Sequence, residues 1–413
     1  MKYLNSQPLN AIVIGSGHYV CGETTLTGLK ETDKDFGVIL PSLLYLRQNL
    51  RIREIFVVGQ NGNKFRRIRD KIRTWEKEMG WDVSLNTFPE ADVNDSKAYL
   101  YALERIPRPA VALIALPDHL HYEVMLACIE QKIPFLVVKP AVIRLKEFYT
   151  LKKKLQESKV FAMVDYHKVY DEVNLSLLQD ILENKYGIIY HMNSLMTQRR
   201  DMLSVYERWF RENPQYNVNH YLGSHYIHLT GFLTKAIPLT VRATAQKGFA
   251  EKKYRAPIAD TIQTHIIWHS PEGYNFSSYH IAGWNDPEKT EAMTYQELHI
   301  LCENGHIFSD QKYRGTRKIL NDIDISVPNP YFFNFTQKLV GGWNLPLKYG
   351  YQSIEQFITL VQNPTLQAEC LRLPTFEESE SVTAILEAAD LSLAEDSRIV
   401  KIKRSTQSEF EIF

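Results

Sequence analysis

Residues 111–140, VALIALPDHLHYEVMLACIEQKIPFLVVKP, decide the fold of this chain. The unbroken apolar run from Ala110 to Leu116 is too short for a membrane span and predicts a strand buried on both faces. Helical spacing of apolar residues then predicts a helix over Leu120–Gln131, and Phe135–Val138 predicts a second buried strand. A strand, a helix and a strand with short joints form a right-handed crossover unit of a parallel sheet. Ligands of such sheets bind beyond the carboxyl ends of the strands, so the polar residues that directly follow both strands mark the expected site.

The composition is that of a folded protein without a charge bias. A length of 413 residues predicts two domains, and 48 basic residues balance 48 acidic ones, which argues against a nucleic-acid binder. The four cysteines are far apart with no CxxC pair, which fits reduced thiols and excludes a zinc ribbon. The first ten residues lack the apolar core of a signal peptide, and no stretch approaches the roughly 20 apolar residues of a spanning helix. We therefore expect a cytoplasmic protein that binds neither membrane nor nucleic acid.

Two glycines follow the first predicted strand, Ala11–Ile14, in the segment Gly15-Ser16-Gly17. Glycines at this place let the backbone turn tightly and approach the pyrophosphate of a dinucleotide. The spacing departs from GxGxxG, because the next glycine is Gly22, and we interpret His18–Asp35 as an insertion. Alone, the glycine pair is more often a plain turn than a nucleotide site. One hypothesis for the insertion is a lid over the pyrophosphate.

The turn after the second predicted strand, Ile55–Val58, bears on the choice of dinucleotide. A fold that selects NAD usually places Asp or Glu here to hold the ribose 2′-hydroxyl, but the sequence is Gly59-Gln60-Asn61-Gly62. Lys64, Arg66 and Arg67 follow, and cations near this turn can hold a 2′-phosphate. The alternative is a solvated helix face. We favour NADP slightly over NAD.

The rest of the chain changes character near residue 165. Alternating strands and helices continue to that point, with Val83–Leu85 as a possible third strand. Beyond it, strands separated by turn residues predominate and predict a second, largely antiparallel sheet, with a hairpin at Asn304-Gly305. A helix is expected over Asn217–Lys235, and the last residues, 404–413, are expected to fray. The predicted strands of this second sheet are 188–196, 239–245, 261–269, 274–281, 295–302 and 306–310.

Several motifs together resemble the Gfo/Idh/MocA oxidoreductases, the family of glucose-fructose oxidoreductase and inositol dehydrogenase. The segment 115–121, ALPDHLH, is similar to the family's TPxxxH segment, and Val138-Lys139-Pro140 is similar to its EKP motif. Residues 221–228 are similar to the DxGxHxxD motif, and residues 373–396 to the usual C-terminal helix. The order and spacing of these motifs cover nearly the whole chain. Three acidic positions of the motifs differ, because Val138, Tyr221 and His228 occupy them here.

The resemblance implies an α/β fold in two domains. Residues 1–166 would form a Rossmann domain, a doubly wound parallel sheet that binds NAD(P). Residues 167–413 would form an α+β domain with a large, mostly antiparallel open sheet for substrate binding and oligomerisation, ending in a helix over 374–396. Through this sheet we expect a homodimer or homotetramer.

The implied activity is hydride transfer between NAD(P) and a secondary hydroxyl or ketone of a sugar, cyclitol or related polyol. The enzyme must supply an acid/base group at the substrate oxygen while the cofactor takes the hydride. We expect His225 as general acid/base and Lys139 as the cation that polarises this oxygen, although the two roles are interchangeable at this stage. The three altered acidic positions motivate an alternative, a catalytically weakened sensor or assembly protein of the same fold.

The remaining site predictions concern cofactor, substrate and metal. His119 and His121 would either line the cofactor or cap the following helix. His220, His225 and His228 also suggest a metal, but no acidic or cysteine partner is near in sequence, and we expect none. The expected substrate contacts are Tyr221, His167, His228 and Arg199. The expected cofactor contacts are Gly15, Ser16, Gly17, His18, Gln60, Asn61, Lys64, Leu116, Pro117, His119, His121 and Lys139.

Overall fold

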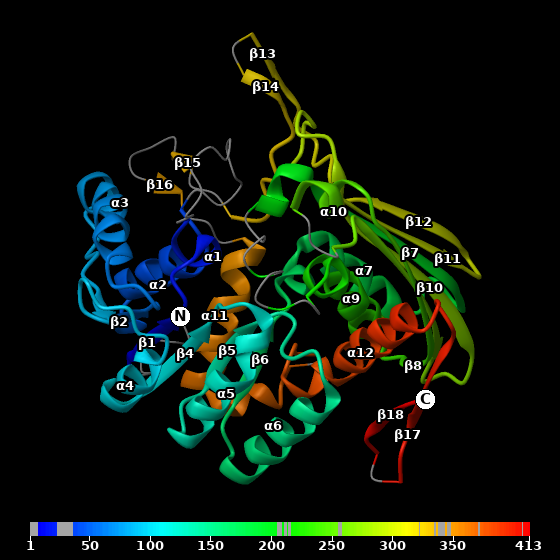
Figure 1. Cartoon of the computed structure of the whole chain (residues 1–413), viewed down its shortest axis with the longest axis horizontal. Coiled ribbons are helices and arrows are strands. Elements are labelled where there is room, and N and C mark those ends of the chain that lie inside the picture. The colour runs from blue at the N-terminus through cyan, green and yellow to red at the C-terminus, as the bar shows by residue number, and fades with distance from the viewer. Residues whose placement is uncertain are drawn as a thin grey trace.

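The computed structural model shows two sheets, each covered by helices (Figure 1). Within the part of the chain that the structure describes, no helix is long and apolar enough to cross a membrane. The described residues are 7–22, 36–204, 209, 213, 216–254, 258–321, 323–333, 336–337, 343–344, 348–370, 372–406 and 408–413.

The first sheet has six parallel strands in the order β3-β2-β1-β4-β5-β6. The order reverses direction beside β1, which makes it a doubly wound Rossmann sheet. Its central strands are apolar and almost fully buried, as expected for strands with helices on both faces. This part of the predicted fold class is confirmed. The strands are β1 Leu9–Ile14, β2 Ile52–Val58, β3 Asn86–Phe88, β4 Ala110–Ile114, β5 Phe135–Val138 and β6 Ala162–Asp165.

Two hydrophobic cores lie on opposite faces of this sheet. Side chains of β1 alternate between them, since Val13 joins the core under α2 and α3 whereas Ile12 joins the core under α4, α5 and α6. The helices are α1 His18–Cys21, α2 Ile39–Gln48, α3 Lys64–Met79, α4 Ala98–Arg105, α5 His121–Glu130 and α6 Leu145–Ser158. Of the predicted insertion, His18–Cys21 form a short helix against α2, and residues 23–35, with the lid hypothesis, lie outside the described residues.

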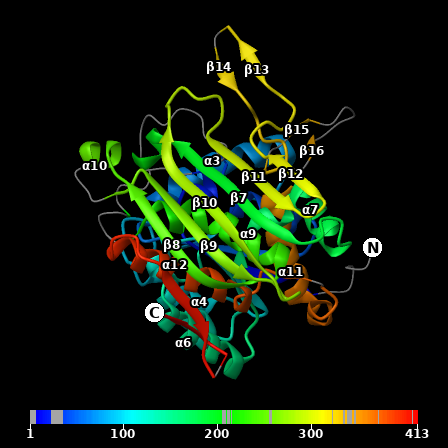
Figure 2. The same cartoon turned by 90° about the vertical axis from the view of Figure 1, so that its right-hand side faces the viewer.

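The second sheet has eight strands in the order β12-β11-β7-β10-β9-β8-β17-β18. All neighbours are antiparallel except β7 and β10, so the predicted large, mostly antiparallel sheet is confirmed. The helices α7, α9 and α12 lie on one face, and Figure 2 shows the other face turned toward the viewer. The strands are β7 Ile189–Arg199, β8 Ile237–Gln246, β9 Thr261–His269, β10 Asn275–Asp286, β11 Thr294–Cys302, β12 Gly305–Asp310, β17 Val400–Arg404 and β18 Phe410–Ile412.

The helices of this half include one that crosses back to the first sheet. They are α7 Glu172–Leu182, α9 Ser224–Thr234, α10 Phe249–Tyr254, α11 Tyr349–Gln362 and α12 Glu380–Ala394. Two short antiparallel ladders pair β13 Lys318–Leu320 with β14 Ile323–Ser326, and β15 Thr336–Gln337 with β16 Trp343–Asn344. The helix α11 packs on α2, and Arg51 donates hydrogen bonds to Thr359 and Gln362. The chain therefore returns to the Rossmann core late in the sequence, and a division at residues 166 and 167 stays a prediction.

Three sequence predictions need correction. The third strand is Asn86–Phe88 and not Val83–Leu85. The C-terminal helix α12 begins at Glu380 and not at residue 374, since the preceding residues form an extended segment and a 3-10 turn. The tail is not frayed, since Phe410 is buried and β18 pairs with β17.

Candidate functional site

Lys139 lies directly beyond the carboxyl end of β5, the strand next to the edge strand β6 of the parallel sheet. β5 pairs with β4 and with β6, where Val138 stands opposite Asp165. The half-buried Lys139 ammonium donates to the backbone carbonyl of Tyr221 and lies 4.3 Å from the centroid of the Tyr221 ring. A cation at the end of a Rossmann strand therefore reaches the helical segment of the second half of the chain.

The carbonyl that receives Lys139 belongs to a π-helical turn, Asn219–Gly223, which leads into α9. Widened turns of this kind are frequent at functional sites. Gly223 allows the turn, because a Cβ at this position would lie 2.0 Å from Oδ1 of Asn219. His225 follows in the first turn of α9 and is 6% exposed. Lys139 thus contacts Tyr221 in this turn, four residues before His225 in the sequence.

His225 is next to a second histidine that is held by a buried carboxylate. The ring centroids of His225 and His167 are 5.1 Å apart. Nδ1 of His167 lies 3.9 Å from Oδ1 of Asp165 and 3.3 Å from the hydroxyl of Tyr19. Tyr19 donates to Oδ2 of Asp165 at 2.8 Å, and Ser353 donates to Oδ1 at 2.7 Å. The cluster therefore joins α1, the end of β6, the following 3-10 turn and α11.

The charge of Asp165 follows from these contacts. Burial raises the pKa of this carboxyl, but His167, Ser353 and Tyr19 outweigh burial and hold the pKa below its ordinary value. Burial, followed by the charge of Asp165, raises the pKa of Tyr19. Asp165 is therefore an anion and Tyr19 a neutral donor at neutral pH.

A second buried network supports the π-helical turn from behind. Nε2 of His220 lies 3.1 Å from Asp390 on α12, and its Nδ1 lies 3.8 Å from Asp118, which follows β4. Arg144 adds an ion pair to Asp390 at 3.4 Å. Burial lowers the pKa of His220, but the two carboxylates outweigh it and raise the pKa overall. These charges fix the turn against the strand ends.

His121 locks the loops after β4 and β5 together. Its ring is fully buried, with Nε2 2.9 Å from the Leu116 carbonyl and Nδ1 3.0 and 3.1 Å from the carbonyls of Pro140 and Ala141. Burial lowers the pKa of His121, against the opposite effects of Asp118 and these carbonyls. Both ring nitrogens face backbone oxygens, so His121 positions the loop of Lys139.

The loops after β1 and β4 form the place where a dinucleotide would sit. Ile14 stands opposite Ile114, so Gly15-Ser16-Gly17 lies beside the loop of Leu116 and Pro117. Gly15 packs tightly, since a Cβ there would lie 2.1 Å from the Ala115 carbonyl oxygen, whereas a Cβ on the exposed Gly17 would meet no atom within 4 Å. The backbone is therefore close-packed at the first glycine and open at the second, which fits a pyrophosphate. His18 and His119, both partly exposed, flank these loops.

A family comparison identifies this domain. The family model that matches residues 9–166 is described as an oxidoreductase family with an NAD-binding Rossmann fold, GFO_IDH_MocA. Residues 9–166 are therefore similar to the NAD-binding Rossmann domain of the Gfo/Idh/MocA oxidoreductases. The predicted resemblance to this family and the predicted Rossmann fold are thereby confirmed for these residues.

Several solved structures have a similar fold over nearly the whole chain. Scyllo-inositol dehydrogenase from Lactobacillus casei, with bound NAD(H) and scyllo-inositol, superposes with a TM-score of 0.65 at 11% identity, over 95% of this chain and 99% of that one. GenD2 from gentamicin A biosynthesis, in complex with NAD, gives 0.66 at 16% identity, over 96% and 97% of the two chains. Aldose-aldose oxidoreductase from Caulobacter crescentus, with glycerol, gives 0.64 at 12% identity, over 95% and 99%. At these identities the likeness shows the fold. A comparison with curated protein sequences found no match.

The turn after β2 carries the residues that we expect to select the cofactor. Gln60 is exposed and Asn61 partly exposed, and the Asn61 side chain accepts a hydrogen bond from the backbone N–H of Asn63 at 3.0 Å. Lys64 begins α3 and is partly exposed. The turn thus presents two amide side chains and a lysine to a cofactor. Gln60 and Asn61 stand where folds that select NAD usually have Asp or Glu.

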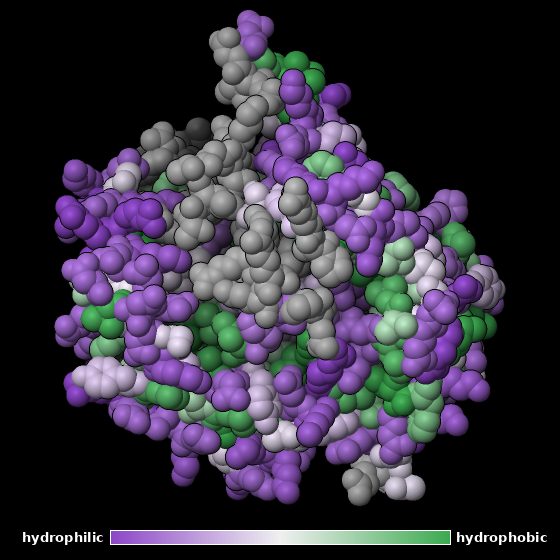
Figure 3. All heavy atoms as spheres, viewed as in Figure 1, coloured by the Kyte–Doolittle hydropathy of each residue, from purple (hydrophilic) through white to green (hydrophobic). Residues whose placement is uncertain are grey.

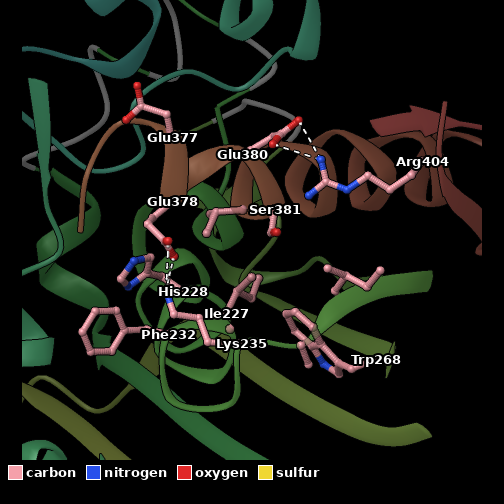
Figure 4. A pocket seen from close by; sticks show the side chains of 14 residues that line it. Ile227, His228, Phe232, Lys235, Trp268, Glu377, Glu378, Glu380, Ser381 and Arg404 are labelled. Carbon is pink, nitrogen blue, oxygen red and sulfur yellow. Dashed lines mark hydrogen bonds and ion pairs between the residues drawn. The ribbon is translucent and has the colours of Figure 1, made fainter. Parts of the chain in front are cut away.

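Two of the expected substrate residues have other partners. His228 stacks on Tyr166 with ring centroids 3.6 Å apart, and burial lowers its pKa to about 3. It lines a cavity of about 290 Å³ between α9, Trp268 and the start of α12 (Figure 4). Arg199 forms a two-point ion pair with Asp201, at 3.1 and 2.9 Å. Tyr221 and His167, by contrast, contact Lys139 and His225 respectively.

Sequence reasoning missed several members of the site, above all Tyr19, Asp165 and Ser353. Asp165 and its neighbours were visible as a polar cluster at a strand end, which is the signal that also marked Lys139. Nothing local in the sequence indicates that Tyr19 and Ser353 meet it. No group of three or more His, Cys, Asp or Glu side chains among the described residues is arranged to hold a metal ion.

Proposed function

We propose that the protein is an NAD(P)-dependent dehydrogenase or reductase that acts on a secondary hydroxyl or ketone of a sugar, cyclitol or related polyol. The observation that carries the proposal is the contact between Lys139, at a Rossmann strand end, and the turn that leads to His225. The match of residues 9–166 to an NAD-binding oxidoreductase family supports it, as do similar folds that bind scyllo-inositol or glycerol.

The chemistry requires a cation and a base at one oxygen. A bound nicotinamide would accept the hydride during alcohol oxidation or supply it during ketone reduction. Lys139 would stabilise negative charge on the substrate oxygen, and His225 would take the hydroxyl proton. Lys139 contacts both the carbonyl and the ring of Tyr221, which precedes His225 by four residues. The Tyr221 ring also stacks near Trp284, with centroids 6.2 Å apart, which gives the substrate region an aromatic wall.

The cofactor would be held by the loops after β1, β2 and β4. Gly15, Ser16, Gly17 and His18 would contact the pyrophosphate, and Leu116, Pro117 and His119 would line the nicotinamide side. At the adenosine end, Gln60, Asn61 and Lys64 would contact the ribose. With amides in place of an acid and a lysine nearby, we favour NADP over NAD.

The open face of the second sheet supports self-association into a dimer or tetramer. Leu195 and Ile281 are paired across β7 and β10 on this face, and Leu301 and Phe308 are 40% and 59% exposed. Figure 3 shows a different side of the molecule, in the view of Figure 1, on which hydrophobic patches lie among mostly hydrophilic residues. A cytoplasmic location stays a prediction.

Two measurements test the proposal. Nicotinamide fluorescence should report binding of NADPH, more tightly than NADH, to the purified protein. A panel of sugars, cyclitols and their ketones should then reveal turnover by the absorbance of reduced nicotinamide. We expect Lys139→Met and His225→Asn to lower kcat by about 10²–10⁴-fold.

Matched controls are available on the surface. Lys153→Met on α6 and His269→Asn at the end of β9 change exposed residues of the same types and should leave kcat unchanged. Cofactor binding without turnover of any alcohol or ketone would favour the sensor alternative. Unchanged turnover in Lys139→Met would remove Lys139 from the mechanism.

A further inference from the structure

We propose that His220 is a positioning residue for the reaction: as an imidazolium between Asp118 and Asp390, it joins the loop after β4 to the turn that Lys139 contacts. The inference rests on the proposed function, because it assigns the charge of His220 to the alignment of Lys139 with substrate. The ring of His220 is fully buried, so it acts through the residues that surround it.

Two consecutive residues hold the π-helical turn against two neighbouring strand ends. The carbonyl of Tyr221 accepts a hydrogen bond from Lys139, which follows β5, and the ring of His220 faces Asp118, which follows β4. The strands β4 and β5 are paired. The loop after β4 is also the one that would line the nicotinamide. A change in the contact between Asp118 and His220 therefore reaches the carbonyl that Lys139 contacts, because the two residues of the turn are adjacent in the chain.

The positions of the two carboxylates determine the charge of His220. Nε2 lies 3.1 Å from Oδ1 of Asp390, and Nδ1 lies 3.8 Å from Oδ2 of Asp118. A neutral imidazole carries one proton, so it would turn a lone pair toward one of these carboxylates. The side-chain amide of Asn217 donates to the same oxygen of Asp390 at 2.9 Å, which leaves Nε2 as a second donor to that oxygen. Only the doubly protonated ring is attracted to both carboxylates.

The other charges around this cluster do not reverse that conclusion. Burial and the charge of Arg144 lower the pKa of His220, but Asp390 and Asp118 raise it by more. Because the pKa in the folded protein lies above that in the unfolded chain, the imidazolium stabilises the fold at low pH. This stabilisation is lost as the pH rises through the folded-state pKa. The remaining titratable groups that face His220 or its two carboxylates are Arg144, Glu387, His119, His121 and Tyr216.

The contact between Asp118 and His220 has room to tighten. Oδ2 of Asp118 and Nδ1 of His220 are both buried, and neither makes a hydrogen bond within the described part of the chain. At 3.8 Å they attract each other but are beyond hydrogen-bond reach, and an approach of about 1 Å would bring them within it. Contacts at active sites commonly shorten when a ligand binds beside them. We therefore expect this pair to close when a dinucleotide binds on the loop after β4.

The variants that test the inference remove one charge each. His220→Gln removes the cation, and Asp118→Asn removes the anion with almost no change of shape, so it serves if His220→Gln folds poorly. The double variant removes both. The matched control is Asp171→Asn, which takes the carboxylate from another buried ion pair, 2.7 Å from Arg314. The described hydrogen-bond partners of Asp171 are Arg314 and the backbone N–H of Val173, neither of which belongs to the turn.

The first readout needs no substrate. Proton–nitrogen correlation spectra of the imidazole rings should show both nitrogens of His220 protonated at about pH 7 in the wild-type protein, and His220→Gln identifies these signals by their loss. Binding of NADPH should shift the Nδ1 signal in the wild type and shift it less in Asp118→Asn. A wild-type His220 with one unprotonated nitrogen overturns the charge assignment. An equal shift in both proteins removes Asp118 from the coupling.

The second readout is turnover of an alcohol or ketone found in the substrate panel. His220→Gln and Asp118→Asn should each lower kcat by about 10²-fold with a smaller change in KM, since a shift of about 1 Å in a positioned group has this effect. The double variant should be no slower than the slower single variant, because both changes remove the same contact. Asp171→Asn should lower the melting temperature and keep the wild-type kcat.

Two kinetic results would refute the coupling. One is a double variant whose loss in kcat is the product of the two single losses, and the other is unchanged kcat in both single variants. A loss of kcat in Asp171→Asn as large as that in His220→Gln would reduce His220 to a structural role. If no substrate is turned over, the proposed function fails, and the spectra still decide the charge of His220.

Discussion

Lys168 is a buried lysine whose charge should make the folded protein less stable at neutral than at alkaline pH. It is 2% exposed, and its ammonium donates to Gln296 at 2.6 Å and to Gln311 at 2.9 Å. The nearby Asp171 and Arg314 neutralise each other in an ion pair of 2.7 Å. Burial is the main cause that lowers the pKa of Lys168 from 10.5 to about 7. The charge of Asp171 opposes this decrease, and the charge of Arg314 adds to it.

The size of the effect follows from linkage between protonation and folding. Between pH 7 and 10.5 the unfolded chain binds the lysine proton and the folded chain does not, so the free energy of unfolding rises with pH in this window. One pKa unit corresponds to about 1.4 kcal/mol. Integrating the two titration curves from about pH 7 to about pH 9 gives a gain of roughly 2 kcal/mol from Lys168 alone.

The perturbation is Lys168→Met, compared with Lys153→Met, which removes an exposed lysine on α6. Urea denaturation followed by tryptophan fluorescence gives the free energy of unfolding of each protein at about pH 7 and about pH 9. The wild type and Lys153→Met should gain about 2 kcal/mol more than Lys168→Met over this interval. The reasoning is refuted if Lys168→Met shows the same pH dependence as the wild type.

Three further predictions follow from single contacts. Gly223→Ala should lower kcat and the melting temperature, because the added Cβ would lie 2.0 Å from the Asn219 side chain and displace the carbonyl that Lys139 contacts; unchanged kcat would contradict this. Arg372→Leu should lower the free energy of unfolding by about 1–3 kcal/mol, measured by urea denaturation, since its guanidinium donates to two carbonyls in the last turn of α9. Acidification should weaken self-association in sedimentation velocity, because histidines cluster on the open sheet face and burial, with two neighbouring histidines, lowers the pKa of His191 there. His299→Gln should reduce this pH dependence, and association that is equally strong near pH 8 and near pH 5.5 would exclude the histidine cluster as its cause.

The parallel sheet could be predicted because its strands carry a strong local signal. Phe135–Val138 is apolar at every position and buried between two strands, and the sequence bounds are those of β5. Leu145–Ser158 shows the apolar spacing of a helix with one buried face, and α6 has these bounds. Where both faces or one clear face of an element are buried, the residue pattern alone determines the element.

The elements that the sequence did not predict correctly are stabilised by contacts with residues far away in the chain. β3 is an edge strand of three residues, Asn86–Phe88, and it is defined by pairing with Phe56–Val58 and not by its own apolar content. The C-terminal β18 is ordered by burial of Phe410 and by its pairing with β17. The helix α11 has apolar residues at helical spacing, but its place on the Rossmann core depends on contacts with Arg51, some 300 positions earlier.

The same distinction explains which site residues could be found and bears on the choice between enzyme and sensor. Lys139 and His225 stand at a strand end and in a helix motif, where local sequence marks them. Tyr19 and Ser353 come from separate parts of the chain and donate to the carboxylate of Asp165, and no local pattern in the sequence indicates that these three residues meet. From sequence, the replacement of three acidic motif residues by Val138, Tyr221 and His228 argued for weakened catalysis. In the structure, Asp165 is an anion close to His167, and the His167 ring lies near that of His225. Asp165 can therefore supply the negative charge that the three replaced acidic residues no longer provide, and this favours an acid/base site over a sensor.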